Sequence, residues 1–227
     1  MTNTSVIKQT DPHAAAIARQ TLNEGGVIAI ATDTVYGVGC MLDNTAAIAR
    51  IYAIKGRDKL KAIPVLIGDE AQLELVVDNI SGRTRQLTAR FWPGALTVVI
   101  SKHQALPDLF TTYGTVGVRL PNHDWLRKLI KTCGPLAVTS ANISGEPSLA
   151  TAEDVLASLD GRINLLVDGG RCDGGVPSTV VDCSVEPPVI LREGAIADAV
   201  VEFMHSLSFR EGSSALPGHH RKIQRTH

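Results

Sequence analysis

Short apolar runs alternate with amphipathic segments along most of the chain. The apolar runs predict buried strands at residues 27–31, 63–67, 96–100, 115–120, 136–139, 163–167, 179–183 and 189–191. The segments between them carry apolar residues at helical spacing and predict helices, among them residues 14–24, 45–55, 122–133 and 196–205. This alternation is typical of an α/β domain.

Polar residues mark the expected starts of the helices, because short oxygen-bearing side chains accept the free N–H groups of a first turn. Thr151 and Asp154 have the spacing of a capping box. The other expected capping residues are Asp11, Asn44, Asp69 and Ser81. Glycines are expected to end three helices, at Gly25, Gly56 and Gly134.

The composition changes from Ser206 onward. This segment is basic and holds few large apolar residues, so it lacks the surface that would offset the entropy lost on ordering. We therefore expect one domain over residues 1–205 and a mobile basic tail over residues 206–227. A basic tail is able to contact RNA, although a solvated terminus is the simpler interpretation.

Composition narrows the class of protein. The chain has 227 residues, of which 44% are hydrophobic and 20% charged, as expected for a globular domain. A net charge of −1 and an aromatic content of 4% argue against a surface built mainly for nucleic acid. No apolar run approaches the roughly 18 residues of a membrane span, and the N-terminus lacks a signal-peptide pattern. We expect a cytoplasmic protein with no membrane partner.

The four cysteines and the isolated histidines do not form a recognisable site. Metal-ligand spacing is absent, so the cysteines are expected to be reduced and mostly buried thiols. They are Cys40, Cys133, Cys172 and Cys183. His13, His103 and His123 stand singly and are expected to be structural or at the surface.

Two polar clusters in the first half of the chain follow predicted strands or helices. Residues 32–39 come directly after a buried strand and combine threonine hydroxyls with glycines, which suits a ligand-binding loop or an ordinary turn. Residues 55–61 are strongly basic. They are interpreted either as a solvated loop favoured by the helix dipole or as a clamp for phosphate groups.

Two further clusters lie in the second half. Residues 139–145 hold four short polar side chains and a glycine after a strand, and residues 174–182 form a glycine-rich lead into another. Neither a Gly-x-Ser-x-Gly elbow nor a phosphate-binding loop motif is present. Hydroxyl and amide groups without a visible base suit the holding of an anion better than covalent catalysis.

Taken in order, these segments resemble the YrdC/TsaC family of threonylcarbamoyl-adenylate synthases. The resemblance spans about residues 26–194. The matching segments are Thr32-Asp33-Thr34-Val35-Tyr36-Gly37, Lys55-Gly56-Arg57, Phe91-Trp92-Pro93-Gly94, Val118-Arg119-Leu120-Pro121, Ser140-Ala141-Asn142-Ile143-Ser144-Gly145, Pro177-Ser178-Thr179-Val180 and Leu191-Arg192-Glu193-Gly194.

The resemblance implies a single YrdC-like domain, with a twisted mixed sheet flanked by helices around a positively charged concave cavity. It also implies a reaction in which L-threonine, bicarbonate and ATP give threonylcarbamoyl-AMP and pyrophosphate. Partner proteins would then transfer the threonylcarbamoyl group to an adenosine in tRNA. Such a transfer depends mainly on positioning and charge neutralisation. We expect Mg²⁺ to accompany ATP and to be bound mostly through phosphates and water, so no protein metal cage is expected.

The same resemblance assigns residues to the two substrates. Lys55 and Arg57 would act electrostatically in catalysis, with no general base. The residues implied for ATP are Lys55, Arg57, Lys61, Thr115, Ser140, Asn142, Ser148 and Arg192. The residues implied for threonine are Thr34, Arg119, Val138 and Ser178.

Two departures from the family pattern and two rival functions accompany this hypothesis. Some relatives carry a histidine near threonine where this chain has Leu66, and longer relatives add a C-terminal domain that we expect this chain to lack. One rival is an RNA-binding module using the same cavity. The other is a carbamoyl-adenylate-handling domain of the hydrogenase-maturation type, which usually sits in a much longer chain with zinc-binding segments.

Overall fold

The computed structural model describes residues 3–106 and 114–213, with side chains up to residue 207. Ten strands form one mixed sheet in the order β1-β8-β2-β3-β7-β4-β6-β5-β9-β10. The strands are β1 (Ser5–Lys8), β2 (Ile28–Ile30), β3 (Gly37–Met41), β4 (Val65–Leu66), β5 (Leu96–Ser101), β6 (Thr115–Arg119), β7 (Leu136–Ser140), β8 (Leu165–Asp168), β9 (Thr179–Asp182) and β10 (Val189–Arg192).

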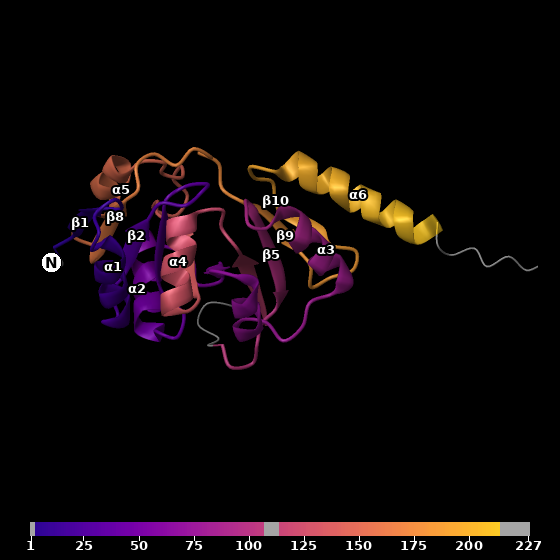
Figure 1. The fold of residues 1–227 in the computed structure, drawn as a ribbon, viewed down its shortest axis with the longest axis horizontal. Helices are drawn as coiled ribbons and strands as arrows, with labels where there is room; N and C mark the ends of the chain where they lie inside the picture. Colours follow the sequence, from indigo (N-terminus) through magenta and orange to yellow (C-terminus); the bar gives the residue numbers. More distant parts are fainter. Residues whose placement is uncertain (1–2, 107–113, 214–227) are drawn as a thin grey trace, which may run out of the picture.

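Helices cover both faces of this sheet, which confirms the predicted α/β class (Figure 1). They are α1 (Ala14–Asn23), α2 (Thr45–Lys55), the 3₁₀ helix η1 (Glu70–Leu75), α3 (Gly82–Phe91), α4 (Asp124–Cys133), α5 (Ala152–Leu159) and α6 (Ala197–Ser213). Apolar residues of α1 and α4 pack on one face of the sheet, and those of α2, α3, α5 and α6 contribute to the core on the other face.

Strand alternation divides the core into these two layers. In β2, Ile28 and Ile30 face α1 and α4, whereas Ala29 belongs to the opposite core. In β7, Val138 likewise belongs to the layer of α1 and α4, and Ala137 to the other. Because side chains alternate along a strand, the odd and even positions of each central strand serve different layers.

Most predicted helix starts are confirmed. The side chains of Asn44, Asp69, Ser81 and Thr151 accept backbone N–H groups of the first turns of α2, η1, α3 and α5. His123 caps α4 in the same way, which gives this histidine a structural role. Asp11 instead accepts from the backbone N–H of His13, and α1 begins at Ala14 without a side-chain cap.

Three expectations about the elements are corrected. Residues 37–41 were expected to belong partly to a loop but form β3, because Gly37 and Gly39 let this strand lie against β7; a Cβ at Gly37 would lie 2.6 Å from Val138 Cγ1. Strand β1 was not predicted at all; its residues are mostly exposed at the sheet edge, so it lacks an apolar run.

The third correction concerns the end of the last helix. The last helix was expected to stop at residue 205, but α6 continues to Ser213, and Leu207 is buried. Residues 206–213 therefore belong to α6 rather than to a separate tail, because Leu207 extends the apolar side of the helix. The rest of the predicted tail, residues 214–227, lies outside the described residues. The prediction for the cysteines is confirmed, since all four are unpaired and three are buried.

Candidate functional site

A polar cavity of about 120 Å³ opens over the central strands, on the same side of the sheet as α1 and α4. Leu66 of β4, Arg119 of β6 and Val138 of β7 line it. Their strand neighbours Val65, Val118 and Ala137 belong to the opposite core, so strand alternation places the three lining residues on one face.

Strand pairing brings the sequence clusters together around this cavity. Gly37 of β3 pairs with Ser140 of β7, so the loops that precede β3 and follow β7 are adjacent. The backbone N–H of Ser144 donates to the carbonyl of Lys55 at 2.9 Å, which joins the basic loop after α2 to the same region. Clusters distant in sequence thus form one site.

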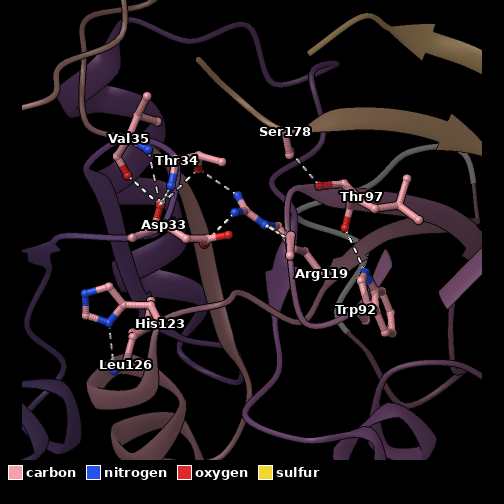
Figure 2. A network of polar contacts seen from close by, with 12 residues as sticks. Asp33, Thr34, Val35, Trp92, Thr97, Arg119, His123, Leu126 and Ser178 are labelled. Carbon is pink, nitrogen blue, oxygen red and sulfur yellow. Dashed lines mark hydrogen bonds and ion pairs between the residues drawn. The ribbon is translucent and has the colours of Figure 1, made fainter. Parts of the chain in front are cut away.

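The turn between β2 and β3 is fixed by its own threonine. The Thr32 hydroxyl oxygen accepts the N–H groups of Thr34 and Val35 at 3.1 and 3.3 Å, and its hydroxyl donates to the carbonyl of Val35 at 2.7 Å. All three residues are buried. The turn holds the Thr34 hydroxyl beside Arg119, as Figure 2 shows.

Arg119 is bound on three sides. Its Nε donates to the carbonyl of Gly94 at 2.9 Å, Nη1 to the Thr34 hydroxyl at 2.9 Å and Nη2 to the Asp33 carboxylate at 2.6 Å (Figure 2). The residue is only 6% exposed. Burial lowers the pKa of its guanidinium, and the charge of Asp33 opposes that shift. Asp33 was assigned no role from the sequence, and the only signal was its position between two threonines.

Ser178 and Arg192 form the neighbouring wall. The Ser178 hydroxyl lies 2.8 Å from that of Thr97, and Arg192 Nη2 donates to the carbonyl of Ser178 at 2.8 Å. The pKa of Arg192 is lowered first by burial and then by the charges of Arg119 and Arg57. Arg57 and Arg119 therefore lie close enough for their charges to affect Arg192.

Arg57 enters the cavity from the loop after α2. Gly56 ends this helix in the left-handed conformation, with φ of 56°, which glycine adopts without strain. Arg57 then donates through Nε to the carbonyl of Lys61 at 3.0 Å and through Nη2 to that of Ala62 at 2.8 Å. The guanidinium thus folds the basic loop back on itself and lines the cavity.

Lys55, which the sequence places either in a solvated basic loop or in a clamp for phosphate, is buried in the structure. Its side chain is 1% exposed, and its ammonium donates to the carbonyls of Ser140 and Asn142. Burial, followed by the charge of Arg57, lowers the pKa of Lys55 to about 8. The Asn142 amide donates in turn to the carbonyls of Ile143 and Glu146. Both side chains shape the loop after β7 rather than line the cavity.

Seven of the residues implied by the family resemblance line this one cavity. They are Thr34, Arg57, Arg119, Val138, Ser140, Ser178 and Arg192. Lys55 and Asn142 lie behind it. Lys61 is exposed, Ser148 is half-buried, and Thr115 starts β6 opposite Ser101; none of these three is among the lining residues. Leu66, which stands where some relatives have histidine, also lines the cavity.

The charged lining favours an anion. Three arginines line the cavity, and its described lining includes no aspartate or glutamate. Among the described residues, no group of three or more His, Cys, Asp and Glu side chains is arranged to hold a metal ion. The described helices likewise include none long and apolar enough to cross a membrane. Such a site is suited to carboxylate and phosphate groups.

Comparison with known proteins identifies the family of this chain. A family model described as "Telomere recombination" (Sua5/yciO/yrdC) matches residues 20–194. The threonylcarbamoyl-AMP synthase of Bacillus subtilis is 42% identical over 202 residues, covering 88% of this chain and 58% of that protein. The chain thus spans little more than half the length of the first curated relatives that it matches.

Solved structures show the same fold. The crystal structure of P. abyssi Sua5 complexed with L-threonine is 37% identical, with a TM-score of 0.78, and covers 86% of this chain and 57% of that one. The match to the crystal structure of E. coli YciO has a TM-score of 0.77 at 24% identity and covers 86% of this chain and 96% of that one. This likeness concerns the fold alone. By the extent of the family match and the identity of its relatives, the chain belongs to the Sua5/yciO/yrdC family.

Proposed function

We propose that this chain is a threonylcarbamoyl-AMP synthase, which makes threonylcarbamoyl-AMP and pyrophosphate from L-threonine, bicarbonate and ATP. One observation carries the proposal: a buried arginine, Arg119, shares a cavity with Arg57 and Arg192. A guanidinium has five N–H donors, and three of those of Arg119 are used by Gly94, Thr34 and Asp33. The remaining two suit an amino-acid carboxylate.

The positions of the other groups support a division of the cavity. The Thr34 hydroxyl contacts Arg119 and the Ser178 hydroxyl lines the same cavity; both suit threonine, and the P. abyssi relative of known structure binds L-threonine. Arg57 and Arg192 suit the phosphate chain of ATP. A cavity of about 120 Å³ is small beside the roughly 300–1,000 Å³ of common ligand pockets, so the nucleotide would extend beyond it.

The proposed reaction uses positioning and charge. The threonine amine and bicarbonate give a carbamate and water. A carbamate oxygen attacks the α-phosphorus of ATP, the bond to the β-phosphate oxygen breaks, and pyrophosphate leaves with the bonding electrons. Arginines beside the phosphates neutralise the developing charge, and such positioning accounts for most of the catalysis in phosphoryl transfer. Mg²⁺, bound mainly through phosphates and water, would supply further neutralisation.

We also infer the setting of this activity. Threonylcarbamoyl-transferase proteins would pass the group to tRNA in the cytoplasm. The decisive test is incubation of the protein with ATP, Mg²⁺, bicarbonate and labelled L-threonine. We expect a labelled threonylcarbamoyl adduct, with pyrophosphate release that requires both threonine and bicarbonate. Rapid release without threonine in carbonate-depleted buffer would indicate a simple ATPase. RNA binding without any adduct would favour the RNA-binding alternative.

A further inference from the structure

The carboxylate of Asp33 is the one acidic group that contacts an arginine of the cavity in the described part of the chain. Its Oδ1 lies 2.6 Å from Arg119 Nη2, and both side chains are largely buried, at 14% and 7% exposure (Figure 2). Asp33 itself is not among the described lining residues. Asp33 therefore acts on a ligand by its hold on Arg119 and by its charge, without lining the cavity.

Asp33 and two other acceptors define the orientation of the guanidinium. Thr34 and Asp33 belong to the turn after β2, Gly94 follows α3, and Arg119 ends β6. Three acceptors from two separate segments leave a planar group little freedom to rotate. The two N–H groups without a partner among the described residues are thereby held in a fixed direction.

Two basic side chains, those of Arg119 and His123, are close enough to interact with the charge of Asp33. His123 is close enough to affect Asp33, but burial lowers the pKa of its imidazole, and its Nδ1 accepts a backbone N–H. His123 is therefore neutral near pH 7, and Arg119 is the cation that Asp33 balances. By contrast, Arg57 and Arg192 bond only to carbonyl and hydroxyl oxygens within the described residues.

We propose that Asp33 is a positioning and specificity residue that reserves Arg119 for a carboxylate and keeps phosphate away from it. The pair Arg119–Asp33 has no net charge, so it offers hydrogen bonds to a zwitterionic amino acid without a strong attraction for a dianion. A second negative charge would also be repelled by Asp33. Phosphate groups are thereby directed to Arg57 and Arg192. The identity of the amino acid rests on the proposed function; the exclusion of phosphate does not.

The test uses inorganic phosphate as the probe and Asp33→Asn as the variant. Asparagine keeps the shape and an acceptor oxygen but removes the charge. Asp173→Asn is the matched control, because it removes the same charge from an exposed position in a nearby loop. Binding of labelled L-threonine is measured by equilibrium dialysis at constant ionic strength, with and without phosphate.

We expect phosphate to leave threonine affinity unchanged in the wild-type protein and in Asp173→Asn. In Asp33→Asn, phosphate at about one tenth of its wild-type Kd should about double the apparent Kd for threonine, since a gain of about 1.4 kcal/mol makes the phosphate Kd of the variant tenfold lower and equal to that concentration. Phosphate should also stabilise Asp33→Asn against heat more than it stabilises the wild type, and a second change, Arg119→Gln, should abolish that gain. The proposal would be overturned if phosphate competed with threonine equally in the wild type and in Asp33→Asn, or if it competed in neither.

Other outcomes are also decisive. If the wild type does not bind threonine, the proposed function fails, but the thermal effect of phosphate on Asp33→Asn and its loss with Arg119→Gln still test the role of Asp33. A lower melting temperature with unchanged phosphate selectivity would reduce Asp33 to a structural residue and overturn the proposal. If Asp33→Asn does not fold, the wild type decides: phosphate should displace ATP and not threonine, and displacement of both contradicts the proposal.

Discussion

The two halves of the cavity hold their cations by different means. In the half around Arg119, the partners come from distant segments and include a carboxylate, so the charge of the arginine is balanced. In the half around Arg57, this arginine and Lys55 behind it donate only to backbone and amide oxygens within the part of the chain that the structure describes. Arg57 takes its acceptors from residues four and five positions away.

This difference indicates which half is formed before ligands bind. Arg119 and Thr34 are fixed by the sheet and by a buried turn, so the half proposed for threonine needs little rearrangement. The loop from Arg57 to Lys61 is held by local bonds, and Lys61 is exposed. Local contacts of this kind open at a lower free-energy cost than core strands do. We expect the half proposed for ATP to adjust as the nucleotide binds.

The largest effect should follow from Arg119→Ala. The change removes a charge-assisted hydrogen bond to the threonine carboxylate, worth about 1.5–3 kcal/mol, so threonine affinity should fall about 10- to 150-fold. ATP affinity should change much less. Because Asp33 loses its partner, the free energy of unfolding should also fall by about 3 kcal/mol. Calorimetric titrations and urea unfolding measure these quantities.

Arg57→Ala is the matched variant from the other half, and ATP affinity should suffer in it while threonine binding is retained. Equal losses of both ligands in both variants would show that the cavity is not divided in this way. If Arg119→Ala lowered the melting temperature and spared threonine affinity per folded molecule, Arg119 would be a structural arginine that bonds carbonyls such as that of Gly94.

Lys55→Met tests the buried cation that lacks a carboxylate. The pKa of Lys55 is about 8 in the folded protein against 10.5 for an ordinary lysine, so the unfolded chain binds more protons between these values. The contribution of Lys55 to stability should therefore be least favourable below pH 8 and rise by about 3 kcal/mol as the pH reaches 10.5. Urea unfolding of both proteins across this range gives the difference, and a constant difference would contradict the assignment.

Thr34→Val should have a smaller effect in the half around Arg119. Valine keeps the shape but removes the hydroxyl that accepts from Arg119 Nη1, so a buried donor loses its partner. We expect a loss of about 1–3 kcal/mol in stability and about tenfold in threonine affinity. Thr132→Val, which changes an exposed threonine of α4, is the control. An unchanged threonine affinity would remove Thr34 from the proposed site.

The smallest effect is expected for Lys61→Ala. The side chain is exposed, so stability should change by no more than about 0.5 kcal/mol. If Lys61 meets the phosphate chain as an exposed charge, ATP affinity should fall by up to about fivefold and threonine affinity should not change. Titration with each ligand measures both. A loss of threonine affinity would show that the two halves are coupled through this loop.

The pattern of apolar residues predicted most central strands, and short polar side chains predicted the helix caps, because both signals are local. Asn44 and Ser81 cap α2 and α3 through hydrogen bonds to residues three positions ahead. The prediction failed where an element depends on a neighbour. Strand β3 contains two glycines and exists because it pairs with β2 and β7, and the predicted end of α6 ignored the packing of Leu207.

For the candidate site, the sequence by itself supplied the polar clusters and the family resemblance, because each cluster is a short contiguous segment with its own composition. Only the tertiary structure decided that Lys55 turns inward to carbonyl oxygens, that Asp33 balances Arg119, and that Leu66 joins the lining. The contacts of Lys55 and Asp33 join residues 85 to 87 positions apart along the chain, and Leu66 pairs with the distant Arg119. Strand register and burial determine which polar groups of the site meet, and no single segment encodes either of them.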